Sequence, residues 1–271
     1  MAEQRDVPRT ENSDSRQRAA DARGGACLLL HGIAAEPRQF DGLTENLDRC
    51  GIKWRAPLLP GHGTRYEDLR GITWEDWYET AEKAFDELRG EHGRVSVAGF
   101  SIGSLLGIEL ARRRDVSRMA LLNAPLFSFY PFLPQRLFLK VLNLLAREIR
   151  TFAPPCSNGN VRTYRRMPVS ILNTMAELVE RTKANLPHVK CPCFIVHSVF
   201  DLASRARSAR YMLKHLGSSE KCILWLRSRE HSILEGNARH RVIAAVRCFL
   251  ADEHEFYEMT RRRSPKQGDN L

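Results

Sequence analysis

The segment Arg94-Val95-Ser96-Val97-Ala98-Gly99-Phe100-Ser101-Ile102-Gly103 decides how the rest of the chain is interpreted. Its apolar first half, which ends at Ala98, predicts a short buried strand. Residues 102–113 carry apolar side chains at helical spacing and predict a helix with a wide apolar face. Between them lies the spacing Gly-x-Ser-x-Gly, which between a strand and a helix is typical of a sharp turn that presents a nucleophilic serine. Ser101 is therefore the candidate nucleophile.

The glycines at 99 and 103 give this pattern its physical meaning. The turn is so tight that side chains two residues before and after the serine would clash with the backbone, and glycine removes that clash. The turn also places Ser101 at the positive end of the following helix, which stabilises developing negative charge. The same five-residue pattern can occur by chance, so its interpretation depends on the strand and helix around it and on partner residues.

Strands and helices alternate on both sides of this turn. The expected strands are 26–30, 52–57, 119–123, 193–197 and 222–226, and the expected helices are 39–49, 74–89, 169–186, 206–216 and 237–250. Thr73 with Asp76 three residues later resembles a capping box at the start of one of these helices. Such alternation predicts the α/β class, with a mostly parallel sheet and helices on both faces.

The chain divides by composition into five segments. We expect a disordered polar tail at 1–24, a first core part at 25–124, a helical cap insertion at 125–187, a second core part at 188–257 and a basic tail at 258–271. No clear strand pattern is visible in the insertion, whose length exceeds that of an ordinary connection.

Charge and cysteine content limit the location and the partners. The net charge is +10, but the basic residues occur in small dispersed groups and no nucleic-acid-binding motif accompanies them, so we expect an arginine-rich surface and no nucleic-acid partner. There is no apolar run of membrane-spanning length, no signal-type segment at the start, and seven scattered cysteines typical of free thiols. These features favour a cytoplasmic location and leave the oligomeric state open.

A serine hydroxyl needs a base before it can attack a carbonyl. In this architecture an acid and a histidine follow the serine, each on a loop after a later strand. Asp201 follows the strand 193–197 and His231 follows the strand 222–226. We therefore expect His231 to act as general base and Asp201 to orient it. The backbone N–H groups that stabilise the oxyanion are then those of Ile102 and Ile33.

Other residues compete for these roles. The rival histidines are His197, His215 and His240, and the alternative acids are Glu230 and Glu235. Cys191 and Cys193 are spaced like metal ligands, but only two cysteines lead into an apolar strand, so no metal is expected. His62, between two glycines, is interpreted as structural.

The chain resembles the bacterial carboxylesterase and monoacylglycerol lipase group of the α/β-hydrolase superfamily. The motifs that carry the resemblance are Leu28-Leu29-Leu30-His31-Gly32, Pro60-Gly61-His62-Gly63, Trp74-Glu75-Asp76-Trp77, Gly99-Phe100-Ser101-Ile102-Gly103, Lys190-Cys191-Pro192, Asp201 and Arg229-Glu230-His231. The resemblance extends from about residue 27 to residue 250. It implies an α/β-hydrolase fold and a serine esterase that cleaves carboxylic esters through an acyl-enzyme without a cofactor.

The chain departs from the family pattern at two places. Val199 and Phe200 precede Asp201 where the family has Gly or Arg-His, and Glu230 stands where members commonly have Gly. We expect the second change to bring a carboxylate near His231 and to raise its basicity.

The aromatic insertion suggests a substrate class. Phe127, Phe129, Phe132 and Phe138, together with His31 and Gly32, would line a pocket for a fatty-acyl chain. An apolar ester or a monoacylglycerol is then the expected small-molecule partner. Equally, these aromatic residues could simply pack the cap onto the core.

Three rival functions stay open. A thioesterase, peptidase or acyltransferase would use the same three residues, and a phosphate-bearing thioester would use Arg162, Arg165 and Arg166 of the cap. A ligand-binding protein could keep the fold without turnover. A membrane-surface enzyme would combine the aromatic cap with basic patches and bind weakly to anionic membranes.

Overall fold

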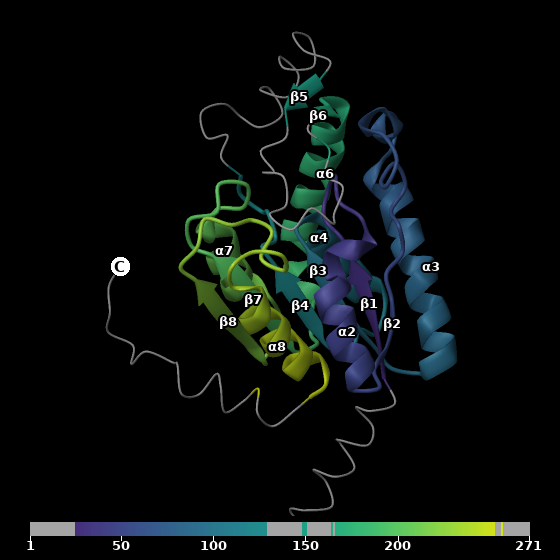
Figure 1. The fold of residues 1–271 in the computed structure, drawn as a ribbon, viewed down its shortest axis with the longest axis vertical. Helices are drawn as coiled ribbons and strands as arrows, with labels where there is room; N and C mark the ends of the chain where they lie inside the picture. The colour runs from purple at the N-terminus through teal and green to yellow at the C-terminus, as the bar shows by residue number, and fades with distance from the viewer. Residues whose placement is uncertain (1–24, 129–147, 151–163, 165, 253–255, 257–271) are drawn as a thin grey trace, which may run out of the picture.

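The computed structural model describes residues 25–128, 148–150, 164, 166–252 and 256 (Figure 1). Its centre is a six-stranded sheet in the order β2-β1-β3-β4-β7-β8, and every neighbouring pair is parallel. The strands are β1 (Ala26–Leu30), β2 (Lys53–Arg55), β3 (Val95–Phe100), β4 (Met119–Leu122), β7 (Cys193–Ser198) and β8 (Lys221–Leu226). The expected parallel sheet is confirmed.

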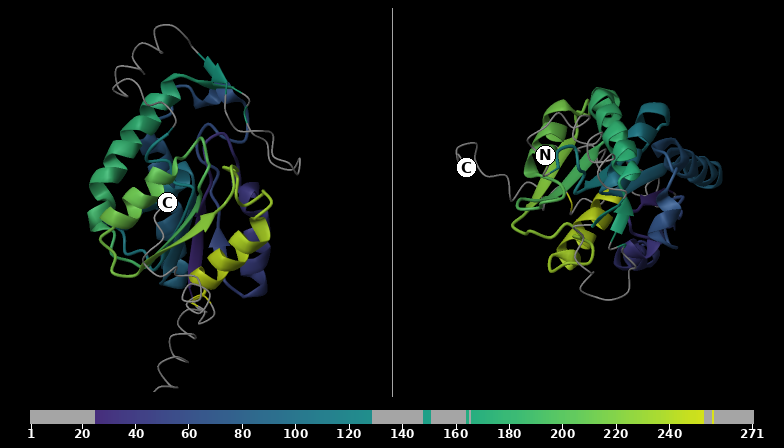
Figure 2. Two further views of the ribbon diagram at one scale, coloured as in Figure 1. Left: turned by 90° about the vertical axis from the view of Figure 1, so that its left-hand side faces the viewer. Right: turned by 90° about the horizontal axis from the view of Figure 1, so that it is seen from above.

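Helices cover both faces of this sheet, as the sequence predicts (Figures 1 and 2). On one face lie α3 (Trp74–His92), α4 (Ile102–Arg113), α6 (Ser170–Asn185) and α7 (Ala206–His215), and on the other lie α2 (Asp41–Arg49) and α8 (Arg239–Leu250). Alternate residues of β1 show the division, because Leu28 and Leu30 pack on the first face while Cys27 and Leu29 pack on the second. The short 3-10 helices are η1 (Pro37–Phe40), η2 (Tyr66–Leu69) and η3 (Leu186–His188).

The start of α3 shows how local sequence sets an element. The Thr73 hydroxyl accepts the Asp76 N–H at 3.4 Å, and the Asp76 carboxylate accepts the Thr73 N–H at 2.8 Å. This is the expected capping box, which satisfies backbone donors that the first turn leaves without partners. Gly93 ends the helix with φ of 70°, a conformation that glycine adopts without strain.

The insertion differs from the expectation of helix without strand. Besides α6 it contains β5 (Glu148–Arg150) and β6 (Arg166–Pro168), which pair antiparallel. Each strand has three residues, too few to show an alternating pattern in the sequence. Glu148 accepts a hydrogen bond from the Tyr66 hydroxyl at 2.9 Å and forms an ion pair with Arg70 at 3.0 Å, so this hairpin rests on η2. Residues 129–147 and 151–163 of the insertion and most of both tails lie outside the described residues, and the domain limits and the character of the tails stay predictions.

A buried carboxylate fixes α6 behind the serine turn. Glu109 of α4 is fully buried, and its Oε1 lies 3.0 Å from Arg113 and 3.0 Å from Arg181 of α6. A buried carboxylate without such partners would be strongly destabilising, so these contacts hold α6 against the helix that follows Ser101. No helix in the described part of the chain is both long and apolar enough to cross a membrane.

Candidate active site

Ser101 lies between β3 and α4 in a conformation that few side chains adopt, with φ of 52° and ψ of −120°. The glycines around it are required by close backbone approach. A Cβ at position 103 would lie 1.9 Å from the carbonyl oxygen of Leu30, and one at position 99 would lie 2.4 Å from the Gly103 backbone. The turn therefore has the sharp geometry that the sequence predicts, and it raises Ser101 at the carboxyl edge of the sheet.

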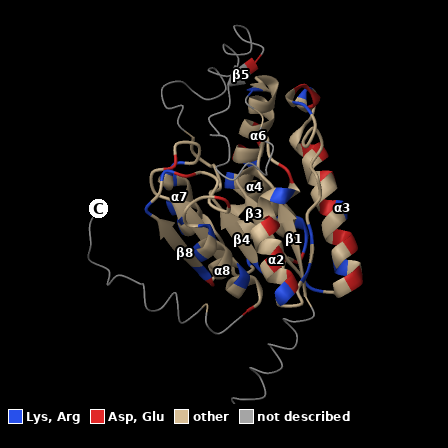
Figure 3. Cartoon of the chain, viewed as in Figure 1, with Lys and Arg blue, Asp and Glu red and all other residues tan. Residues whose placement is uncertain are grey.

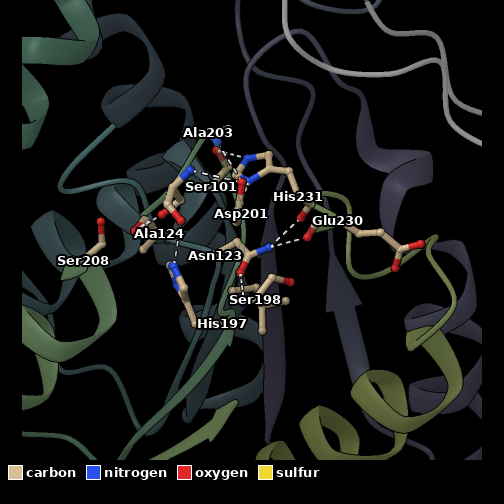
Figure 4. A network of polar contacts seen from close by, with 12 residues as sticks. Ser101, Asn123, Ala124, His197, Ser198, Asp201, Ala203, Ser208, Glu230 and His231 are labelled. Carbon is tan, nitrogen blue, oxygen red and sulfur yellow. Dashed lines mark hydrogen bonds and ion pairs between the residues drawn. The ribbon is translucent and has the colours of Figure 1, made fainter. Parts of the chain in front are cut away.

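The ring of His231 joins Ser101 to Asp201 (Figure 4). Its Nε2 lies 3.0 Å from the Ser101 hydroxyl, and its Nδ1 lies 2.6 Å from Asp201 Oδ2. An ionised Asp201 accepts the Nδ1–H, which leaves Nε2 free to accept the proton of the serine hydroxyl. The structure thus brings together the three side chains that the sequence selected from separate loops.

Asp201 is buried and held by its own loop. Its side chain is 1% exposed, and Oδ1 accepts the N–H groups of Ala203 at 2.8 Å and Ser204 at 3.2 Å. These two hydrogen bonds fix the orientation of the Asp201 carboxylate. Asp201 can therefore orient the His231 ring and stabilise its cation.

The rival residues lie elsewhere. His197 is buried in β7 with its Nε2 2.9 Å from the Ser204 carbonyl, His215 stacks on Tyr211 in α7, and His240 is exposed near the start of α8. The expectation that Glu230 places its carboxylate near His231 is wrong. The Glu230 carboxylate accepts the Asn237 N–H at 3.0 Å and points away from the His231 imidazole (Figure 4). Gly236 leaves room for this, since a Cβ there would lie 2.2 Å from the Glu230 carboxylate.

The loop after β1 approaches the serine closely. A Cβ at Gly32 would lie 2.8 Å from the Phe100 ring and 3.3 Å from the Ser101 Cβ, so only glycine fits there. The Gly32 N–H donates to the buried Gln39 side chain at 3.1 Å, which fixes the loop. No backbone hydrogen bond among the described residues uses the Ile33 N–H, and the Ile102 N–H, at the first position of α4, lacks a partner within its helix. Both donors are available to a ligand oxygen.

His31 supports this loop from within the core. It is fully buried, its Nε2 accepts the Leu59 N–H at 3.1 Å, and its Nδ1–H donates to the Gly32 carbonyl at 2.9 Å. Burial, with repulsion from His62, lowers the pKa of His31 to about 3, so its ring stays neutral. These contacts support a structural role for His31, and its expected place in the substrate pocket stays a prediction.

Asn123 is a residue beside the site that sequence reasoning missed. It directly follows β4 in a left-handed conformation with φ of 45°, and it is fully buried. Its Oδ1 accepts the Ser198 N–H at 2.9 Å, and its Nδ2 donates to the His231 carbonyl at 2.7 Å. The sequence did contain a signal for this residue. It is a polar residue at the carboxyl end of an expected buried strand, which is where functional groups lie in such sheets.

The aromatic pocket is only partly within the described residues. Phe129, Phe132 and Phe138 lie outside them. Phe127 packs edge-on against Tyr211 of α7 at 5.4 Å, with Lys183 of α6 4.8 Å from its ring centroid. This placement supports the packing alternative for Phe127, because the ring joins the insertion to the core.

The described residues contain no group of three or more metal-ligating side chains. Cys193 is buried in β7, and its thiol donates to the Cys191 carbonyl at 3.3 Å. The neighbouring Cys191 thiol and, after it, burial raise the pKa of Cys193, which opposes a metal-binding thiolate.

Comparisons with known proteins agree with the fold. The family profile described as serine aminopeptidase, S33, matches residues 21–237. A thermostable monoacylglycerol lipase of Bacillus sp. (strain H-257) is 28% identical over 75% of this chain and 81% of its own length. A carboxylesterase of Bacillus subtilis (strain 168) is 22% identical over 83% and 92%. A solved structure from the metagenome-derived lipolytic enzymes LipS and LipT is 23% identical over 84% of this chain and 94% of its own, with a TM-score of 0.76.

Proposed function

Because this chain belongs to the serine aminopeptidase S33 family, we propose that Ser101, His231 and Asp201 form a catalytic triad that hydrolyses carboxylic esters. At the coarser level the protein is a hydrolytic enzyme of the ester-cleaving lipase and esterase group, and the α/β-hydrolase resemblance is confirmed. The observation that carries the proposal is the single imidazole ring that contacts both the serine hydroxyl and the buried carboxylate.

In the first half of the reaction the Ser101 oxygen attacks the ester carbonyl carbon while its proton moves to His231 Nε2. The carbonyl oxygen becomes an oxyanion, which the N–H groups of Ile33 and Ile102 stabilise. The carbon–oxygen bond to the alcohol then breaks, and the departing alcohol takes the proton from His231. The acyl group is left on Ser101.

The second half reverses these roles with water. His231 Nε2 takes a proton from water, whose oxygen attacks the acyl carbon, and the second oxyanion collapses with return of the proton to Ser101. The products are a carboxylic acid and an enzyme with its original protonation. Asp201 keeps its charge throughout and stabilises the His231 cation.

For the substrate, we propose an apolar acyl ester, with a monoacylglycerol as the leading candidate. Support comes from the similarity to a monoacylglycerol lipase and from the aromatic residues of the insertion. No cofactor has a role in this scheme. A cytoplasmic location stays a prediction, and so does weak contact with a membrane surface.

The test is hydrolysis of a series of 1-monoacylglycerols and matched p-nitrophenyl esters from short to long acyl chains. We expect a maximum of kcat/KM at one chain length and loss of turnover in Ser101→Ala. Turnover of thioesters or of aminoacyl amides in place of every ester would move the assignment to a thioesterase or a peptidase. Saturable ligand binding without turnover would instead indicate a ligand-binding protein.

A further inference from the structure

A cavity of about 670 Å³ lies against the loop that carries Asp201. The acid loop, the beginning of α7 and the loop before His231 form its walls. Its lining residues are Val199, Phe200, Asp201, Leu202, Arg205, Ala206, Arg207, Arg210 and Arg229. We call this space the arginine cavity. Figure 3 shows basic residues on α7, whose first turns contribute three of the lining residues.

Among the described residues, no acidic side chain pairs with the positive charge of the arginine cavity. None of its four arginines forms an ion pair with a residue that the structure describes, whereas Arg114 lies 2.8 Å from Asp86 and 3.1 Å from Glu82. The Asp201 carboxylate does not compensate, because it is buried and already bound to His231. Glu230, next to Arg229 in sequence, binds Asn237 instead. Four exposed guanidinium groups around one cavity attract an anion with more than one charge.

Two of these arginines are held in place by aromatic rings. The Arg207 Cζ lies 4.4 Å from the Phe127 ring centroid, and the Arg210 Cζ lies 5.5 Å from that of Trp225. Stacking on a ring orients the guanidinium plane and leaves its edge N–H groups free for a ligand oxygen. The first turn of α7 contains no acidic residue, so the positive end of its dipole acts in the same direction.

The other part of the wall is apolar. Phe200 is 53% exposed and Leu202 is 62% exposed, and both lie on the acid loop. Exposed large apolar side chains beside a charged cavity suit a ligand that has an apolar or glycerol-like portion next to its anionic group. A free inorganic ion would use only the arginines.

The position of the arginine cavity relates it to the reaction. Its lining includes Asp201, and one imidazole ring separates Asp201 from Ser101, with contacts of 2.6 Å and 3.0 Å on its two nitrogens. We propose that the arginine cavity binds a phosphate group carried by the ester substrate, so that the enzyme prefers phosphorylated esters over neutral ones. This inference rests on the proposed esterase function and names its substrate class.

The test compares two esters that differ only in the phosphate, 1-octanoylglycerol and 1-octanoylglycerol 3-phosphate. The variant is Arg205→Gln with Arg229→Gln, because both side chains are exposed and neither stacks on a ring in the described structure. Arg227→Gln is the matched control, since Arg227 is an exposed arginine on the same loop as Arg229 that does not line the cavity. All proteins are assayed at low and at high salt.

We expect a lower KM for the phosphorylated ester in the wild type. The double variant should raise this KM by about tenfold for each arginine replaced, with kcat and the KM of the neutral ester unchanged. Added salt should raise only the KM of the phosphorylated ester. Equal KM values for the two esters in the wild type, or an equal effect of Arg227→Gln, would overturn the inference.

A direct binding measurement separates this inference from the proposed function. Calorimetric titration of Ser101→Ala with 1-octanoylglycerol 3-phosphate should show binding that the two arginine substitutions weaken, even if neither ester is hydrolysed. Absence of binding overturns the site.

Addition of glycerol 3-phosphate during hydrolysis of the neutral ester shows whether the cavity binds a phosphate on the substrate or on a separate molecule. Competition supports a phosphate on the substrate, and a change of kcat without competition assigns the site to a separate ligand and overturns the substrate claim.

Discussion

The side-chain amide of Asn123 donates a hydrogen bond of 2.7 Å to the main-chain carbonyl of His231. The same side chain accepts the Ser198 N–H at 2.9 Å, so one buried residue ties the histidine loop to the end of the strand that leads to Asp201. Asn123 touches no reacting atom in the proposed mechanism. It is a positioning residue that fixes how the His231 ring meets its two partners.

Replacement of Asn123 by glycine should lower kcat by roughly tenfold to a hundredfold, because small displacements of catalytic groups are costly. Glycine accepts the φ of 45° at this position, so the effect reports the lost amide and not backbone strain. Steady-state kinetics should show KM little changed, and the pH dependence of kcat should shift with the altered His231 environment. An unchanged kcat and pH profile in a folded variant would remove Asn123 from the positioning role.

Substitution of Gln39 by methionine tests the loop that carries the proposed oxyanion donor. The change keeps the length of the buried side chain but removes the oxygen that accepts the Gly32 N–H. We expect kcat/KM to fall by about tenfold or more, since loss of a whole oxyanion donor costs about a hundredfold to a thousandfold. Affinity for a trifluoromethyl ketone inhibitor should fall in parallel. Normal affinity for this transition-state analogue would argue against a role for Gln39 in the oxyanion loop.

Gly103→Ala should lower the free energy of unfolding by several kcal/mol. The new Cβ would lie 1.9 Å from the Leu30 carbonyl oxygen, so the backbone must move. Gly90→Ala is the matched control, since it lies within α3 and a Cβ there meets nothing within 4 Å. That control should be neutral or more stable by up to about 1 kcal/mol. Thermal unfolding measures both, and equal melting temperatures would show that the turn tolerates a wider spacing.

The buried histidines should make stability depend on pH. Burial lowers the pKa of His62 to about 4, while an unfolded histidine titrates near 6.5. Between these values the unfolded chain binds a proton that the folded protein does not, so the free energy of unfolding falls as the pH falls below 6.5. The loss approaches about 1.4 kcal/mol per pH unit for each such histidine. His31, with a pKa of about 3, acts in the same direction.

His62→Asn keeps a donor toward the Leu59 and Pro60 carbonyls but cannot titrate. Denaturant unfolding between pH 7 and pH 4 should therefore show a shallower loss of stability in this variant than in the wild type. Parallel curves for the two proteins would mean that His62 is protonated in the folded state. In that case its Nε2, which has no hydrogen-bond partner among the described residues, would need a new acceptor.

The sequence predicted the parts of the molecule that carry a long apolar periodicity, or in which only a few residue types can occupy a position. The sheet, the covering helices and the serine turn follow from apolar periodicity and from two glycines that a tight turn requires. Asp201 and His231 were selected by their positions after later strands, and the structure places both beside Ser101. Where a position allows few residue types, sequence alone is informative.

Other features depend on contacts that no local pattern reveals. The direction of the Glu230 carboxylate depends on Gly236 and Asn237, which fold back toward it. The paired bonds of Asn123 reach segments 75 and 108 residues away in the chain, in a way that only the assembled sheet defines. The pairing of β5 with β6 joins two short segments on either side of a long connection. For the same reason the arginine cavity could not be recognised from four basic residues spread over two loops and a helix.

The central claim is that Ser101 is a nucleophile activated by His231. Labelling with a fluorophosphonate probe tests it most directly, in the wild type, in Ser101→Ala and in His231→Ala. We expect stoichiometric labelling of the folded wild type at Ser101, none in Ser101→Ala, and labelling in His231→Ala slowed by several orders of magnitude. Absence of labelling in a folded wild type, or equal labelling in Ser101→Ala, would contradict the account.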